Sequence, residues 1–390
     1  MIRSLSRLLE IVAIIGCLSS SAYYLMCLWS ASVFIRARKR NADIPSGPFL
    51  PPVTILKPLK GIDPDIYEAF RSHCLQDYPQ YEIIFGVSDA EDPAVASVEQ
   101  LKREFPELSI SLIVCNRILG ANVKVSNLEC MVQSARYDHL IVNDSDIRVE
   151  RDYLKKVLAP FTDEQIGMVT CLYRGAPAKT LGSHLEALGI STDFSAGVLI
   201  AQQLEGGLHF GLGSTLAFRR ADLDRIGGFK AIVDFLADDY ELGRRIADIG
   251  RKVVLSSTVV ETHLPPYDLS AFLSHQMRWA RGVRDARLGG YIGLLSTFGL
   301  MWSLLTVIAA HAAPWSWGVL AAVWLLRLAV AITVGKSALQ DKNLIAQLWL
   351  LPLRDLIAVG VWIASFFGHT VVWRGEKFTL KDGQLLRRNG

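Results

Sequence analysis

The sequence predicts an α/β domain with a mainly parallel sheet, placed between apolar segments long enough to cross a membrane. Two observations carry this prediction. Between residues 41 and 270, short runs rich in β-branched and aromatic residues alternate with helical patterns, which is typical of βαβ units. Uncharged stretches of 25 residues (11–35) and 39 residues (288–326) flank that region, and about 20 apolar residues suffice to cross a bilayer.

The predicted strands follow one another through the α/β region. They are expected at 53–56, 81–87, 109–114, 139–142, 167–171, 214–218 and 252–256. Helical patterns lie between them, for example at 65–75 and 93–105. Ligands of such sheets bind outside the carboxyl ends of the strands, and acidic residues gather there in this sequence. The GxGxxG fingerprint after the first strand and the Walker A pattern are both absent from the sequence.

The charged flanks of the apolar stretches predict the membrane topology. Residues 1–40 read as a retained N-terminal anchor, because the apolar run at 11–35 is longer than the core of a cleaved signal peptide. Four basic residues at 36–40 follow that run directly, and basic flanks mark the cytoplasmic side. The body at 41–270 is then a cytoplasmic domain of a multi-pass membrane protein.

An interfacial helix is expected at 271–290, and spans or re-entrant segments at 291–373. Two spans fit at about 291–310 and 314–335, with Arg327 reaching toward the interface. The apolar region at 344–373 is either a re-entrant piece or an interfacial helix, followed by a span. The tail at 374–390 is basic, which favours the cytoplasmic side, where the body is also expected. That placement requires an even number of crossings after the body, and a count of three crossings conflicts with it.

The formal net charge of +3 is distributed unevenly along the chain. Residues 41–270 carry 22 Lys and Arg against 32 Asp and Glu, and the two ends are basic. A nucleic-acid-binding domain would concentrate basic residues on its folded body, so a nucleic-acid partner is not expected. An acidic body between basic ends is typical of a domain held against an anionic lipid bilayer.

Asp144 and Asp146 come directly after the predicted strand at 139–142. Two carboxylates two residues apart at a strand end can reach one hard divalent cation, Mg²⁺ or Mn²⁺, which usually brings a diphosphate with it. The alternative is capping of a turn, and we favour the metal. Asp89 closes the run IIFGVSD and is either a turn residue or a carboxylate that binds the base or ribose of a nucleotide.

Asp238 and Asp239 open a predicted helix at 240–249. Acidic residues in a first helical turn are favoured by capping and by the helix dipole. Alternatively, one carboxylate caps while the other is a general base that takes a proton from an attacking hydroxyl. Lys124, in GANVKVSN, is likewise either a solvated lysine or a contact to a diphosphate.

The segment HQMRW at 275–279 lies in a predicted helix that carries Arg at every third position from 278 to 287. An Arg row beside a membrane span is usually an electrostatic anchor. Arg278 with Trp279 can also pair with a phosphate and close a pocket. Four glycines between 206 and 213 are expected to form a flexible loop near the site.

Together these motifs resemble the ceramide glucosyltransferase family, glycosyltransferase family 21. The matching segments are LKPLKG at 56–61, SDAEDPA at 88–94, GANVKVSN at 120–127, NDSDIRV at 143–149, ADDYELGRRIAD at 237–248, HQMRW at 275–279 and VWRGEKFTLKDG at 372–383. The resemblance implies a GT-A fold, which is Rossmann-like, with N- and C-terminal transmembrane helices. It also implies inverting transfer of a hexose, most often glucose, from a UDP-sugar to the hydroxyl of a ceramide-type membrane lipid.

The resemblance assigns roles to residues of this chain. Asp239 falls on the catalytic base, and Asp144 with Asp146 on the metal site for Mg²⁺ or Mn²⁺. The implied donor-binding residues are Asp89, Lys124, Asp144, His275, Arg278 and Trp279. His275 departs from the family pattern, which has Gln or Arg at that position.

Three other interpretations remain open from the sequence. The chain also resembles the bacterial hopanoid glycosyltransferase, which implies transfer of N-acetylglucosamine to bacteriohopanetetrol at a bacterial inner membrane. A membrane nucleotidyl- or phosphotransferase would also use an acidic metal site at strand ends. A non-enzymatic membrane scaffold would keep the fold without using the acids.

Overall fold

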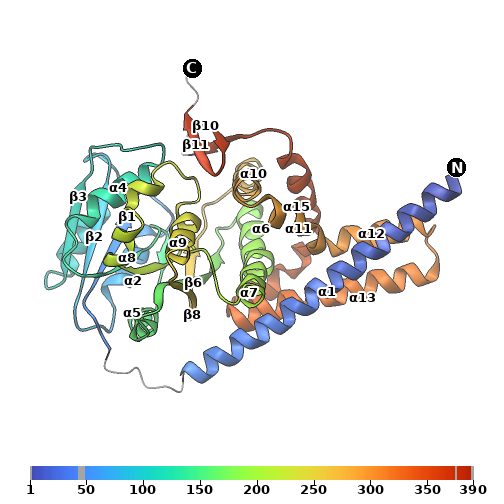
Figure 1. The fold of residues 1–390 in the computed structure, drawn as a ribbon, viewed down its shortest axis with the longest axis horizontal. Coiled ribbons are helices and arrows are strands. Elements are labelled where there is room, and N and C mark those ends of the chain that lie inside the picture. The colour runs from blue at the N-terminus through green and yellow to red at the C-terminus, as the bar shows by residue number, and fades with distance from the viewer. Residues whose placement is uncertain (1, 43–48, 374–375, 388–390) are drawn as a thin grey trace. The chain divides into compact units, whose positions relative to one another are not determined.

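The computed structural model describes residues 2–42, 49–373 and 376–387 (Figure 1). The chain divides into two compact units. The helical unit comprises Met1–Arg36, Lys179–Ile200 and Pro266–Asp382, and the sheet unit comprises Ala37–Ala178, Ala201–Pro265 and Gly383–Gly390. Residues 179–200, which the sequence leaves inside the predicted body, therefore belong to the unit that contains the apolar helices.

The sheet unit is built on an eight-stranded sheet with the order β3-β2-β1-β4-β7-β6-β8-β5. Its strands are β1 (Val53–Pro58), β2 (Tyr81–Val87), β3 (Ser109–Val114), β4 (His139–Val142), β5 (Ile147–Arg148), β6 (Ile166–Ala176), β7 (Leu216–Arg219) and β8 (Lys252–His263). The strands β3, β2, β1 and β4 pair in parallel, as do β6 and β8. β7 runs antiparallel to both β4 and β6, so the sheet is mixed, with a parallel half.

The sequence predicts β2, β3 and β4 residue for residue. β6 and β8 extend well beyond the predicted 167–171 and 252–256, because they pair with each other as far as Ala176 and His263. Polar residues in these extensions interrupt the apolar run on which the prediction rests. The sequence does not predict β5, which is only two residues long and is held by pairing with β8.

Helices pack on the sheet and bury its faces. They are α2 (Ile66–Cys74), α3 (Ala94–Glu104), α4 (Val123–Val132), α5 (Tyr153–Leu158), α8 (Arg220–Arg225) and α9 (Asp238–Asp248). All six residues of β1 are buried, as expected of a parallel strand covered on both sides. Phe70 of α2 and Phe85 of β2 meet in the core with ring centroids 4.7 Å apart. This core holds the carboxyl ends of β1, β2 and β4 in place.

The helical unit contains segments of membrane-spanning length. Among the described residues, the helices at Ser6–Arg40, Pro314–Ala338 and Leu344–Ser365 are long and apolar enough to cross a bilayer. A fourth candidate is the pair Leu288–Thr297 and Gly299–Ala309, which is bent by 56°. The described part of the chain therefore has three or four candidate spans, and the predicted segments at 11–35, 291–310 and 314–335 fall on three of them.

The elements of the helical unit include these candidate spans and the segments between them. Its helices are α1 (Ile2–Ala42), α6 (Leu181–Gly189), the π-helix η2 (Ile190–Phe194), α7 (Ser195–Leu204), α10 (Leu269–Ala286), α11 (Leu288–Gly293), α12 (Gly299–Ala309), α13 (Pro314–Ala331), α14 (Leu344–Gln347) and α15 (Leu351–Ser365). β9 (Thr370–Trp373) and β10 (Glu376–Lys381) form an antiparallel pair.

The expectation for Arg327 is wrong. Its side chain does not extend to an interface; the residue is 2% exposed and lies inside the helical unit. The guanidinium donates to Asp193 Oδ1 at 2.5 Å and to Asp355 Oδ1 at 2.8 Å. A buried arginine with two carboxylate partners has no need to reach water, and the sequence pattern does not show that these partners come together.

Candidate active site

The loop after β4 carries Asp144 and Asp146. The residue before them, Asn143, is fully buried, and its Nδ2 donates to Ser214 O at 2.6 Å and to the Tyr153 hydroxyl at 2.9 Å. The Asp144 N–H donates to Gly213 O at 3.3 Å. These bonds fix Asn143 and the backbone of Asp144 at the carboxyl end of a parallel strand, where α/β sheets bind ligands.

Lys124 lies between two carboxylates. Its Nζ is 2.8 Å from Asp144 Oδ1 and 3.0 Å from Asp238 Oδ2. Burial alone would lower the pKa of Lys124, but Asp144, Asp238 and Asp239 outweigh it, so the pKa lies above its ordinary value. The lysine is therefore charged, and it joins the end of β4 to the first turn of α9.

Asn122 positions Lys124 by capping α4. Its side-chain oxygen accepts the Val125 N–H at 3.2 Å, as the N-cap of a helix does. Its Nδ2 donates to Phe235 O at 2.9 Å, and its own N–H donates to Val233 O at 2.8 Å. The same residue thus ties the start of α4 to the segment that leads into Asp238.

Asp239 is held by two N–H donors. Gly213 donates to Oδ2 at 2.7 Å and Tyr240 donates to Oδ1 at 2.8 Å. Burial and the neighbouring Asp238 raise the pKa of Asp239 to about 6, against the opposing charge of Lys124. A carboxylate with this pKa is still ionised at pH 7 and is a stronger base than an ordinary aspartate. The arrangement therefore suits proton abstraction.

Gly213 lies between Asp144 and Asp239. A Cβ added at Gly213 would be 2.7 Å from Asp144 Oδ2 and 3.3 Å from Asp239 Oδ2. The two carboxylates therefore approach the same point from the end of β4 and the start of α9. Gly213, in the predicted loop at 206–213, therefore lies beside two of the acidic residues that the sequence predicts for the site.

Asp146 and Lys57 lie on the other side of the same loop. Asp146 accepts a hydrogen bond from the Thr262 hydroxyl, and burial together with Asp144 raises its pKa to about 6. Lys57 is fully buried at the end of β1, and its Nζ donates to Asp144 O at 3.0 Å. Burial lowers the pKa of Lys57 to about 7, although Asp146 and Asp144 oppose that shift. Sequence reasoning missed Lys57 as a site residue; a lysine inside an otherwise apolar strand was the available signal.

The carboxylates offer the oxygen ligands that Mg²⁺ and Mn²⁺ prefer. Asp144 already pairs with Lys124, and Asp146 already accepts from Thr262. Within the described ranges, no group of three or more His, Cys, Asp and Glu side chains is arranged to hold a metal ion. Mg²⁺ commonly takes one or two carboxylates and completes its coordination with phosphate oxygens and water. The residues therefore fit a metal that arrives with a diphosphate rather than a preformed protein cage.

Asp89 is exposed just after β2. Its Oδ1 accepts the Glu91 N–H at 3.0 Å, and its carbonyl oxygen accepts the Asp92 N–H at 3.2 Å. The structure thus shows the turn-forming role that the sequence allows. Nucleotide binding by Asp89 stays a prediction.

His275, Arg278 and Trp279 lie on α10 in the helical unit. His275 Nδ1 is 3.3 Å from Oε1 of Glu186, a buried carboxylate that the sequence analysis did not single out. The Trp279 ring packs edge to face on Phe194, with centroids 5.6 Å apart. These three residues belong to a different unit from the acidic cluster, so their predicted part in donor binding stays a prediction. A lone acid inside the apolar segment LGSHLEALG was the signal for Glu186.

The arginine row on α10 is only partly a surface feature. Arg284 is 6% exposed and donates to the carbonyl oxygens of Ser365 and Gly368. Arg281 donates to the carbonyl oxygens of Phe367 and Thr370. Two of the four arginines therefore donate to carbonyl groups between the last residue of α15 and the first residue of β9, instead of facing lipid headgroups.

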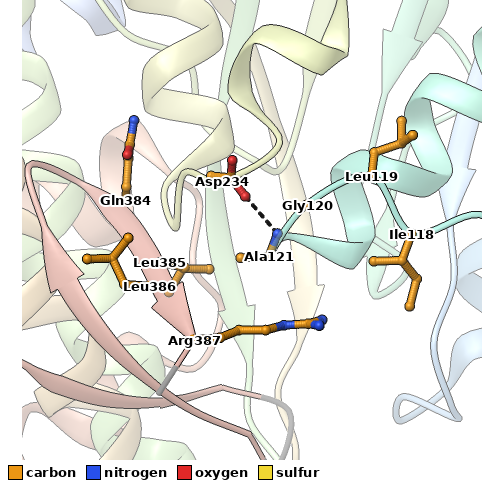
Figure 2. Close-up of a pocket in the computed structure, with 9 residues that line it drawn as sticks. All are labelled: Ile118, Leu119, Gly120, Ala121, Asp234, Gln384, Leu385, Leu386 and Arg387. Carbon is orange, nitrogen blue, oxygen red and sulfur yellow. Dashed lines mark hydrogen bonds between the residues drawn. The ribbon is translucent and has the colours of Figure 1, made fainter. Parts of the chain in front are cut away.

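The C-terminal strand β11 (Gln384–Arg387) borders a cavity of about 460 Å³ in the sheet unit (Figure 2). Asp234 Oδ1 accepts the Ala121 N–H at 2.8 Å, and Asp234 O accepts the Leu385 N–H at 2.7 Å. The strand is thereby tied to the segment that leads into Asp238 and Asp239. The lining residues are Ile118, Leu119, Gly120, Ala121, Asp234, Gln384, Leu385, Leu386 and Arg387.

Comparison with known proteins identifies the family. The family described as Glycosyl transferase family 21 matches residues 12–386. The chain belongs to this family. It is therefore a glycosyltransferase, similar in sequence to ceramide glucosyltransferases, as the motifs predict.

Two relatives are similar to the chain in sequence, and one solved structure is similar to it in fold. Ceramide glucosyltransferase 3 from Caenorhabditis elegans is 26% identical over 86% of this chain and 74% of its own length. Ceramide glucosyltransferase 1 from the same organism is 22% identical, over 97% of this chain and 82% of its own. Mannosyltransferase PcManGT from Pyrobaculum calidifontis, solved with GDP-Man and Mn²⁺, is 18% identical, covers 92% of this chain and 99% of its own, and has a TM-score of 0.51. The predicted GT-A-like α/β fold is confirmed.

Proposed function

We propose that this family 21 glycosyltransferase moves a hexose, glucose first, from a UDP-sugar to a hydroxyl of a ceramide-type membrane lipid, with inversion at the anomeric carbon. The observation that carries the proposal is the cluster of Asp144, Asp238 and Asp239 around Lys124 at the strand ends. In this cluster Lys124 is a cation, Asp144 offers oxygen ligands to a metal, and Asp239 is a carboxylate with a raised pKa. The candidate membrane spans of the same chain supply contact with lipid.

Asp239 is the proposed catalytic base. Its carboxylate takes the proton of the acceptor hydroxyl while that oxygen forms a bond to the anomeric carbon. The bond between that carbon and the diphosphate oxygen breaks, and its electron pair leaves with UDP. A single displacement of this kind inverts the configuration and needs no enzyme nucleophile. The raised pKa of Asp239 and its two fixed N–H donors support this role.

The other site residues act on the donor. Asp144, with Asp146, would hold Mg²⁺ or Mn²⁺, and the metal when bound neutralises charge on the departing diphosphate. Lys124 would place its ammonium on the same diphosphate. The resemblance adds Asp89 as a nucleotide contact. Arg278, Trp279 and His275 are proposed to complete donor binding.

The proposed orientation places the sheet unit and the C-terminal strand on one side, the cytoplasmic side. Residues of β11 belong to the sheet unit, where Gln384 bridges Phe235 and the Leu236 N–H donates to Gly383 O at 3.1 Å. A strand paired with a soluble domain must share its side of the bilayer. The number of crossings between Pro265 and Gly383 is then even, so two of the three apolar segments there cross. Labelling of a cysteine placed at Gln384 tests this: it should react from the same side as one placed in the sheet unit.

The experiment that tests the function uses membranes that contain the full chain. They are incubated with labelled UDP-glucose, UDP-galactose or UDP-N-acetylglucosamine and a lipid extract, and products are identified by mass spectrometry. We expect UDP and a hexosylated ceramide. N-acetylglucosamine on bacteriohopanetetrol would favour the hopanoid alternative. Release of UMP or pyrophosphate without a glycolipid would instead indicate a nucleotidyl- or phosphotransferase.

A further inference from the structure

Four charged side chains lie together inside the helical unit. They are Asp193 on the π-helix η2, Arg327 on α13, and Arg354 and Asp355 on α15. Arg327 is 2% exposed and Arg354 is 7% exposed. Ionisable groups among apolar helices are costly and commonly mark functional sites. A π-helical turn, such as the one that carries Asp193, is also frequent at such sites.

The side-chain nitrogens of Arg327 all donate hydrogen bonds to neighbouring residues. It donates to Asp193 Oδ1, to both oxygens of Asp355 and to the carbonyl oxygen of Thr192. All of its nitrogens therefore have partners. This arginine holds α13, α15 and η2 together, and its role is structural.

Arg354 is different. Its Nη2 donates to Gln276 Oε1 at 3.0 Å and lies 3.6 Å from Asp193 Oδ2. Its Nε and Nη1 are buried and have no hydrogen-bond partner in the described part of the chain, and the same is true of Asp193 Oδ2. A buried polar atom without a partner costs roughly 1–3 kcal/mol. Unpaired donors and an unpaired acceptor thus lie side by side.

This unpaired group adjoins the HQMRW segment. Gln276 links Arg354 to Glu186, since its Nε2 donates to Glu186 Oε2 at 2.7 Å. Phe194, the residue after Asp193, packs on the Trp279 ring. Gly189 leaves room for the guanidinium, because a Cβ there would lie 2.6 Å from Arg354 Nε. The free donors and acceptor therefore sit within the same cluster as the residues proposed to complete the site.

We propose that Arg354 and Asp193 bind the polar headgroup of the acceptor lipid. Arg354 Nε–H and Nη1–H donate to a hydroxyl or amide carbonyl oxygen, and Asp193 Oδ2 accepts an O–H or amide N–H. The two arginines and two aspartates cancel in charge, so the group suits an uncharged headgroup with hydroxyl and amide functions and not an anionic phospholipid. This inference rests on the proposed function, and it adds the residues that select the acceptor.

The test compares Arg354→Met and Asp193→Asn with the wild type, using full-length protein in nanodiscs. Lys336→Met, at an exposed lysine of the helical unit, is the matched control. Binding of a fluorescent short-chain ceramide and of phosphatidic acid is measured directly, and KM is measured separately for ceramide and for the UDP-sugar. We expect both variants to weaken ceramide binding and raise its KM by ~10-fold or more, with the donor KM unchanged. Wild type and Lys336→Met should bind ceramide and not phosphatidic acid.

Several outcomes would overturn the inference. They are unchanged ceramide binding in a folded Asp193→Asn variant, equal changes in the two KM values, or binding of phosphatidic acid in preference to ceramide. If Arg354→Met does not fold, Asp193→Asn decides alone, because it keeps the shape of the side chain. A wild type that binds ceramide but transfers no sugar would contradict the proposed function and leave this inference standing.

Discussion

The Lys124 ammonium lies 2.8 Å from Asp144 Oδ1, at the point where the motifs place a metal and a diphosphate. The protein thus supplies its own cation to carboxylates that would otherwise repel one another. Binding of a metal with a diphosphate must compete with this ammonium or move it onto the phosphate oxygens. One ammonium offsets only part of the charge of Asp144, Asp238 and Asp239, so the cluster keeps an excess of negative charge that favours a cation.

Replacing Lys124 with Met should strengthen binding of Mn²⁺ alone, because Asp144 and Asp238 lose their internal partner. We expect the dissociation constant for Mn²⁺ without nucleotide to fall about 10-fold, equivalent to ~1.4 kcal/mol, while UDP-sugar binding weakens. Electron paramagnetic resonance of free Mn²⁺ and calorimetry measure the two effects. Lys60→Met, at an exposed lysine of the sheet unit, is the control and should change neither. Weaker Mn²⁺ binding in Lys124→Met would contradict this account.

Replacing Asp239 with Asn should abolish proton abstraction and leave the donor site in place. The amide keeps the size of the side chain but is not a base, so kcat should fall by ~100- to 10,000-fold. Calorimetry should show UDP-sugar affinity within a few-fold of the wild type. Asp248→Asn, at the other end of α9, removes an exposed carboxylate and should leave turnover unchanged. Near-normal turnover of Asp239→Asn would exclude it as the base.

The pH profile of the wild type should report the raised pKa of Asp239. The base works only when ionised, and burial with Asp238 raises its pKa to about 6. We therefore expect kcat/KM to be flat above about pH 7 and to fall about 10-fold for each unit below pH 6. Measurements from pH 5 to 8 in one buffer series, with protein stability checked at each pH, provide the test. A constant rate down to pH 5 would rule out a base with this pKa.

Gly213→Ala should impair activity more than stability. The added methyl group would displace Asp144, and through it the arrangement with Asp239, and misplacement of reacting groups by about 1 Å can cost ~100-fold in rate. The melting temperature should drop by only a few degrees. Gly197→Ala is the control, because a Cβ there meets no atom within 4 Å. Parallel loss of activity and of folded protein in Gly213→Ala would mean that the glycine is only structural.

Local patterns predicted much of the fold and the acidic part of the site. Apolar runs followed by acidic residues predicted the carboxyl ends of the strands. Asp144, Asp238 and Asp239 lie close together at that edge of the sheet. The partners of these acids came from distant segments: Lys124 bridges two of them, and Gly213 spaces Asp144 from Asp239. No periodicity predicts such long-range contacts. Arg327 shows the same limit, since its carboxylate partners are 134 and 28 residues away.

The configuration of the product tests the central claim most directly. A UDP-α-hexose and ceramide are incubated with the wild type and with Asp239→Asn, and the glycolipid is analysed by nuclear magnetic resonance for its anomeric coupling. The account predicts a β-linked glycolipid from the wild type and none above background from Asp239→Asn. An α-linked product, or a sugar trapped covalently on the protein, would contradict direct displacement with Asp239 as the base.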